Sequence, residues 1–104
     1  MKYELTGKRI GMITGELKAP VKTWRKAPGV FDNAARAALY YARRYKKRYL
    51  VVPCYNYMQI TFHIVLPEAD IMRFCPGIGD QSMKISTVDP DGTVLEAMAR
   101  KGKP

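Results

Sequence analysis

Four side chains that can hold a phosphate or stack on a nucleobase recur at three- and four-residue intervals in the first half of the chain. Residues at this spacing lie on one face of an α-helix, so the pattern predicts a stripe of cations around one aromatic ring. Arginines in such a stripe can all reach one groove of a nucleic acid, and a tyrosine can stack on a base or bond a phosphate. The residues are Arg36, Tyr40, Arg43 and Lys47, with Arg44 beside them.

The segment before this helix repeats the combination of aromatic and cationic side chains. Trp24 stands among three cations, a pattern used by proteins that bind single strands. Two adjacent cationic segments build a stronger positive field than one helix face alone. The predicted nucleic-acid-binding residues are therefore Lys22, Trp24, Arg25, Lys26, Arg36, Tyr40, Arg43, Arg44 and Lys47.

The charge of the chain is concentrated in the same region. Residues 1–49 contain thirteen Lys or Arg and three Asp or Glu, whereas residues 50–104 contain five and six. The stretch from Lys18 to Arg48 alone has ten cations and one anion. Because nucleic acid is the commonest polyanion in a cell, this asymmetry predicts DNA or RNA as the partner. Little base-reading chemistry is visible, so we expect mostly sequence-tolerant binding.

Two other interpretations stay open for the same residues. A charged outer face is ordinary for a packed helix, and cations in the last turn are favoured by the helix dipole. Exposed Tyr and Arg together are also typical of protein-binding hot spots. The alternative function is a small protein-interaction or inhibitor module, of phage or mobile-element type. It would dock its basic face on an acidic groove of a larger, nucleic-acid-processing protein and regulate it.

His63 is the one histidine, and it could activate the thiol of Cys54 or Cys75 as a nucleophile. Such a pair also needs an orienting group and an oxyanion site, and no motif marks either. The same three residues lack both a C-x-x-C pair and a fourth ligand for a metal site. The sequence therefore favours a non-enzymatic protein with no cofactor and no metal, and an enzyme is the third alternative.

A short segment near the C-terminus resembles a known family. Residues 89–96, Asp-Pro-Asp-Gly-Thr-Val-Leu-Glu, are similar to the last hairpin of vicinal-oxygen-chelate (glyoxalase-like) modules, in which the glutamate can bind a metal. The resemblance covers eight residues, and the chain has no N-terminal histidine ligand to match that family. Glu96 is therefore not carried over as a metal ligand.

Length and composition predict one domain over residues 1–104, since 47% apolar residues can form a packed core. The chain has no run of eighteen apolar residues that could span a membrane and no segment typical of a secretory signal. Two cysteines are consistent with a reducing compartment. These features predict a cytoplasmic protein without a membrane partner.

The clearest predicted element is a helix from Asn33 to about Arg48, with Asp32 as N-cap and Phe31 as a hydrophobic staple. Residues 16–30 contain two prolines and read as a connecting loop, preceded by a short strand near Ile10. The apolar positions of the helix form one stripe that we expect to be buried. These positions are Ala35, Ala38, Leu39, Ala42 and Tyr45.

Strands are predicted after the helix. Residues 49–53 form a short apolar strand, and residues 57–66 alternate strictly between two faces, with His63 on the more polar one. Residues 83–88 form another strand, followed by a turn at 89–92. Residues 94–99 return as the second strand of a hairpin, which we favour, or Thr93 and Glu96 form a capping box for a short helix that ends at Gly102.

The expected fold class is α+β, with a small antiparallel sheet of four to five strands and one basic amphipathic helix packed on one face. We expect the alanine-leucine stripe to pack on the face of Met58 to Leu66, leaving the cations exposed. Residues 100–104 form a basic tail that we expect to be frayed. The apolar edge of the hairpin is compatible with a homodimer, which would double the basic surface.

Overall fold

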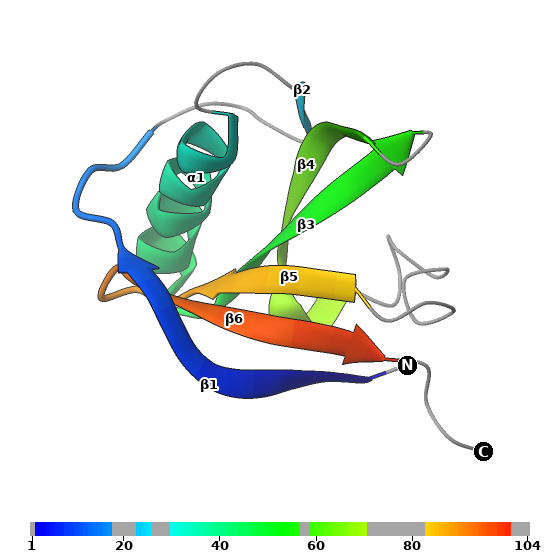
Figure 1. Cartoon of the computed structure of the whole chain (residues 1–104). Helices are drawn as coiled ribbons and strands as arrows, with labels where there is room; N and C mark the ends of the chain where they lie inside the picture. The colour runs from blue at the N-terminus through cyan, green and yellow to red at the C-terminus, as the bar shows by residue number, and fades with distance from the viewer. Residues whose placement is uncertain (1, 18–22, 26–29, 57–58, 71–82, 101–104) are drawn as a thin grey trace.

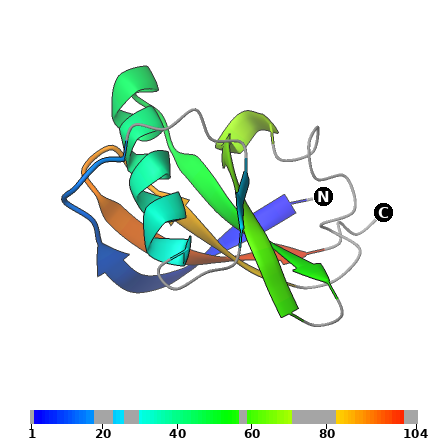
Figure 2. The same ribbon diagram turned by 90° about the horizontal axis from the view of Figure 1, so that it is seen from above.

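The computed structural model describes residues 2–17, 23–25, 30–56, 59–70 and 83–100. They form a six-stranded antiparallel sheet in the order β1-β6-β5-β3-β4-β2, with one α-helix on one side of it (Figures 1 and 2). The expected α+β class is confirmed. The elements are β1 Lys2–Met12, β2 Thr23–Arg25, α1 Val30–Tyr45, β3 Tyr49–Asn56, β4 Gln59–Pro67, the 3-10 turn η1 Glu68–Asp70, β5 Met83–Val88 and β6 Thr93–Arg100.

Helix α1 begins and ends earlier than expected. It starts at Val30, so Asp32 lies in the first turn, where a carboxylate interacts favourably with the positive end of the helix dipole. It ends at Tyr45 because Lys46 adopts a left-handed conformation, with φ of 54°. The Lys47 N–H then donates to the carbonyl of Ala42 at 3.1 Å, the closing bond of a Schellman motif.

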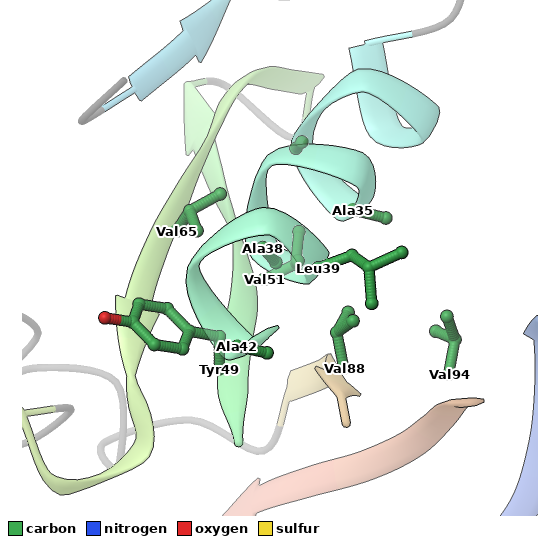
Figure 3. Close-up of a cluster of buried hydrophobic side chains, with 10 residues drawn as sticks. Ala35, Ala38, Leu39, Ala42, Tyr49, Val51, Val65, Val88 and Val94 are labelled. Carbon is green, nitrogen blue, oxygen red and sulfur yellow. The ribbon is translucent and has the colours of Figure 1, made fainter. Parts of the chain in front are cut away.

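The core lies between α1 and one face of the sheet. Ala35, Ala38, Leu39 and Ala42 are completely buried, and their small side chains allow the helix backbone to approach the strands closely. Figure 3 shows this stripe above valines from strands β3, β4, β5 and β6. The residues packed with the stripe include Tyr49, Val51, Val65, Val88 and Val94.

The helix covers the face of β4 opposite to the expected one. Val51 of β3 pairs directly with Val65 of β4, and both belong to the core beneath α1. Leu66 therefore points away from the helix, together with its partner Leu50. Leu66 and Leu50 are nevertheless buried, with 3% and 0% exposure. The period-two pattern identified the two faces, but the more apolar face is not the one that meets the helix: Val65 and His63, on the more polar face, lie on the helix side.

The hairpin predicted for the C-terminal strands is confirmed. Strands β5 and β6 pair from Met83↔Ala99 to Val88↔Val94. In their turn, the Gly92 N–H donates to the Asp89 carbonyl at 2.9 Å, and Gly92 has a φ of 93° that favours glycine. The Asp91 side chain accepts a bond from the Thr93 N–H at 2.9 Å. Residue 93 begins a strand instead of a helix: the Asp89 N–H donates to the Thr93 carbonyl at 3.1 Å, and Thr93 pairs with Met12 of β1.

Two strands differ from the sequence expectation at the edges of the sheet. Strand β2 lies within the segment 16–30 predicted as a loop, and it exists by pairing with β4, where Trp24 opposes His63. Strand β1 is long and pairs with β6, with register shifts between Leu5 and Gly11. Gly7 has a φ of 79° inside this irregular stretch. Such bulges weaken an edge as a template for further strand pairing.

Among the described residues, no helix has the length and apolar character needed to cross a membrane.

Candidate nucleic-acid interface

The predicted site residues that the structure describes are spread along α1 and over the strand before it. Trp24 and Arg25 are placed by their backbone in β2, which pairs beside His63. His63 in turn contacts the ring of Phe31 in the first turn of the helix, at 5.6 Å between centroids. Arg43 and Arg44 lie in the last turn. Lys22 and Lys26 lie outside the described residues, so the structure does not address them.

Arg36 is held between its own helix and the segment after β1. Its guanidinium lies 3.7 Å from the Asp32 carboxylate one turn earlier. It also lies against Gly15, since a Cβ at that glycine would come within 2.7 Å of Arg36 Nη2. The Leu17 N–H donates to the Arg36 carbonyl at 3.2 Å. Residues 13–17, which we call the strap, therefore pack along this side of α1.

Arg43 is bound more tightly by the same strap. Its Nη1 donates to Glu16 Oε1 at 2.7 Å, and its Nε donates to the Pro90 carbonyl in the β5–β6 turn at 3.0 Å. The guanidinium thus joins three parts of the chain. A ligand phosphate would have to compete with a carboxylate that is already in place.

Arg48 forms a similar structural link after the helix. Its Nε donates to Asp89 Oδ1 at 2.7 Å, and Nη1 lies 3.6 Å from Glu68 Oε2. Two carboxylates therefore face one guanidinium, which is partly buried. This group adds no net positive charge to the surface around it.

Three cations at the end of α1 differ from these arginines. Within the part of the chain that the structure describes, no carboxylate forms an ion pair with Arg44, Lys46 or Lys47. Arg44 lies over the ring of Tyr45, with 5.9 Å from Cζ to the ring centroid. Hydrogen bonding with Tyr45 and electrostatic interaction with Tyr40 raise the pKa of Arg44 above its ordinary value. We call these three residues the terminal cations.

A row of tyrosines lies beside the terminal cations. Tyr45 stacks on Tyr49 with centroids 6.4 Å apart, and Tyr49 stacks on Tyr41 at 5.7 Å, each with an interplanar angle of 24°. Tyr40 meets the edge of Tyr41 at 5.3 Å. Burial raises the pKa of Tyr49, which anchors the row in the core.

Tyr45 is not part of the buried stripe in which the sequence placed it. Its exposure is 55%, whereas Tyr49 is 7% exposed. Tyr45 is the last residue of α1, and it is not a member of the buried core cluster. The helical period locates a stripe, but it does not show which positions of the stripe the rest of the fold covers. The exposed ring beside Arg44 is a candidate functional feature that the sequence pattern did not reveal.

The predicted Cys–His pair is not formed by Cys54. His63 pairs directly with Pro53, the residue before Cys54, so side-chain alternation puts the two side chains on opposite faces of the sheet. His63 is buried beneath the start of α1, and its Nδ1 has no hydrogen-bond partner in the described structure. Burial lowers the pKa of His63. Cys75 lies outside the described residues.

No cluster with the makeup of a metal site occurs among the described residues. Glu96, the position that the resemblance to vicinal-oxygen-chelate modules singled out, lies 3.9 Å from Lys84 across the β5–β6 hairpin. Comparison of the chain with protein-family models, curated proteins and solved structures finds no match. The interpretation of this surface therefore rests on its own geometry.

Proposed function

We propose that the protein binds nucleic acid through phosphate contacts made at the C-terminal end of α1. The observation that supports this most directly is the set of terminal cations, Arg44, Lys46 and Lys47, which have no carboxylate partner among the described residues. All three are exposed, so a phosphate can approach them without breaking an ion pair. The net charge of +9 adds a long-range attraction for polyanions.

Arg36 and Arg43 have a secondary role in this proposal. Each is already next to a carboxylate, so exchanging that partner for a phosphate yields less free energy than neutralising an unpaired cation. They contribute to the field along the helix and hold the strap in place. Tyr40 lies between them on the helix surface and remains a candidate for contact with a base or a phosphate.

The β2 segment extends the proposed surface toward the start of α1. A strand that touched both Arg25 and the terminal cations would follow the helix, which has sixteen residues and is about 24 Å long. Trp24, Lys22 and Lys26 belong to this part of the proposal. A path of that length spans several nucleotides, and lysines and arginines that contact phosphates carry no sequence preference of their own.

The test is a titration with duplex DNA, single-stranded DNA and RNA at two salt concentrations. The triple variant R44Q/K46Q/K47Q should lower affinity by roughly tenfold at low salt, and should reduce the slope of log K against log salt by about 2 for a single strand. The matched control is K8Q/R9Q/K84Q, which removes the same charge from strands β1 and β5. It should keep most of the affinity.

Three results would contradict the proposal. A salt-independent affinity would show that phosphates are not the ligand. Equal losses in the two triple variants would show that net charge, and not this surface, drives binding. Failure of all three nucleic acids to bind would favour the alternative, in which the basic face docks on an acidic protein groove.

A further inference from the structure

The geometry points to a single-stranded ligand, one of whose unpaired bases stacks on Tyr45 while the terminal cations hold the adjacent phosphates. This inference rests on the proposed function and names the class of nucleic acid. Three independent features of the described residues carry it: the exposure of one aromatic ring, the support beneath that ring, and the cations beside it.

Tyr45 presents an aromatic ring to solvent at the C-terminal end of α1. Its exposure of 55% is the highest among the exposed large apolar side chains of the described residues. Singly exposed apolar residues are ordinary on protein surfaces. Tyr45, however, is joined to three other tyrosines and an arginine, so it belongs to an organised aromatic surface and not to a scatter of exposed side chains.

The Tyr45 ring is supported from within the protein. It stacks on Tyr49, whose own ring is buried and stacks on Tyr41. A ring that is already fixed loses little conformational entropy when a base stacks on it. A freely rotating tyrosine at a helix end would lose more. The tyrosine row therefore acts as a preorganised platform.

The cations next to Tyr45 can bind the phosphates on either side of a base that stacks on the ring. Arg44 precedes Tyr45, and Lys46 and Lys47 follow it, so the ring is flanked in the chain by three cations that form no ion pair with a carboxylate of the described residues. Single-strand-binding surfaces combine aromatic stacking with a positively charged track for the backbone.

A duplex cannot use this platform in the same way. Its bases are stacked on one another inside the helix, and exposing one costs a few kcal/mol of unstacking and unpairing. A single strand presents its bases without that cost. The surface should therefore prefer single-stranded DNA or RNA over duplex DNA, even though a duplex has a higher density of phosphate charge.

The experiment compares three ligands of equal length: a thymidine homopolymer, an abasic deoxyribose-phosphate strand and a duplex. The abasic strand carries the same phosphates without bases. Wild-type protein should bind the thymidine strand at least about fivefold more tightly than the abasic strand. Y45L should remove that preference while leaving abasic-strand affinity unchanged, and Y45F should retain it because the ring remains.

The outcomes separate this inference from the proposed function. Equal wild-type affinity for the thymidine and abasic strands, or a preference that persists in Y45L, would overturn base stacking at Tyr45 and leave phosphate binding intact. If neither strand nor the duplex binds, the proposed function itself is wrong. Thermal melting of Y45L supplies the folding control, and we expect an unchanged melting temperature because the ring is largely exposed.

Discussion

The two ends of α1 contain similar residues in different environments. At the start, Phe31 rests on a buried histidine and Arg36 lies beside Asp32, so its charge is compensated locally. At the end, Arg44 has an aromatic neighbour and no carboxylate ion pair among the described residues. The comparison teaches that the number of cations in a helix does not measure the charge available to a ligand.

The difference arises from segments far away in the chain. Glu16 reaches Arg43 across 27 residues, and Asp89 reaches Arg48 across 41. Both carboxylates come from connections that the sheet brings to this side of the helix. The terminal cations stay unpaired because these connections do not supply a carboxylate to them in the described structure.

The largest expected effect is a difference between the two groups of cations. Arg36 and Arg43 should matter mainly for stability, and the terminal cations should matter mainly for nucleic-acid affinity. The double variant R36Q/R43Q should lower nucleic-acid affinity by no more than about threefold, because both arginines already have carboxylate partners. It should lower the melting temperature by about 4 °C, since the strap loses its charged contacts. R44Q/K46Q/K47Q should show the opposite pattern, with a roughly tenfold loss of affinity and an unchanged melting temperature. The same pattern in both variants would remove the distinction between the two groups.

Acid should destabilise the start of the helix. Burial lowers the pKa of His63 below its ordinary 6.5, so between the two values the unfolded chain binds more protons than the folded one. The contribution of His63 to the free energy of unfolding is therefore fully present above about pH 6.5. It decreases as the pH falls below that value, by at most about 1.4 kcal/mol per pH unit. Urea unfolding at pH 7 and pH 5.5 measures the change.

The control for this pH effect is His63→Phe, which keeps an aromatic ring against Phe31 and removes the titrating group. The variant should lose the decrease in stability between pH 7 and pH 5.5. A decrease of equal size in the variant would assign the effect to carboxylates elsewhere in the chain.

Relief of backbone strain should stabilise the end of the helix. Lys46 has a φ of 54°, a conformation that costs a non-glycine residue roughly 1 kcal/mol. Lys46→Gly should raise the free energy of unfolding by about 0.5–1 kcal/mol relative to Lys46→Ala, which removes the same charge without relieving strain. Both variants should lose the same small amount of nucleic-acid affinity. A stability of K46G equal to that of K46A would contradict the strain argument.

The smallest expected effect concerns Glu16, whose carboxylate forms the ion pair with Arg43. Glu16→Gln should release this guanidinium for a phosphate and raise affinity by about two- to threefold at low salt. The matched control is Glu96→Gln, which releases Lys84 on another part of the sheet and makes the same change in charge. The control should raise affinity less than E16Q does. Equal increases would show that only net charge matters.

Local sequence patterns predicted the helices and strands that are stabilised by residues close in the chain, or for which few other conformations are available. The interior of α1 follows from good helix formers and an apolar stripe at Ala35, Leu39 and Ala42. The β5–β6 hairpin follows from the proline and glycine of its turn. Strand β2 could not be predicted in the same way, because three residues form a strand only when another strand, here β4, pairs with them.

The sequence predicted which types of residue make up the candidate site, but not the contacts and exposure of each residue. The sequence pointed to the exposed helix face and to the segment before it, including Arg44 and Lys47, through charge and spacing alone. It placed Tyr45 in the core, because spacing alone does not show which positions of a helical stripe the rest of the fold covers. It also treated Arg43 as available, since the partner carboxylate Glu16 lies in a segment with no local signal of its destination.

The amino-acid sequence by itself determined that a basic helix would pack through an alanine-leucine stripe on an antiparallel sheet, because helical and strand periodicities depend on residues close in the chain. Only the tertiary structure decided which face of β4 meets that helix, which arginines carry compensating carboxylates and which tyrosine reaches solvent. These outcomes depend on contacts between segments many residues apart in the chain. Helices and strands with the same local sequence patterns can pack together in more than one way, so the local patterns do not determine these contacts.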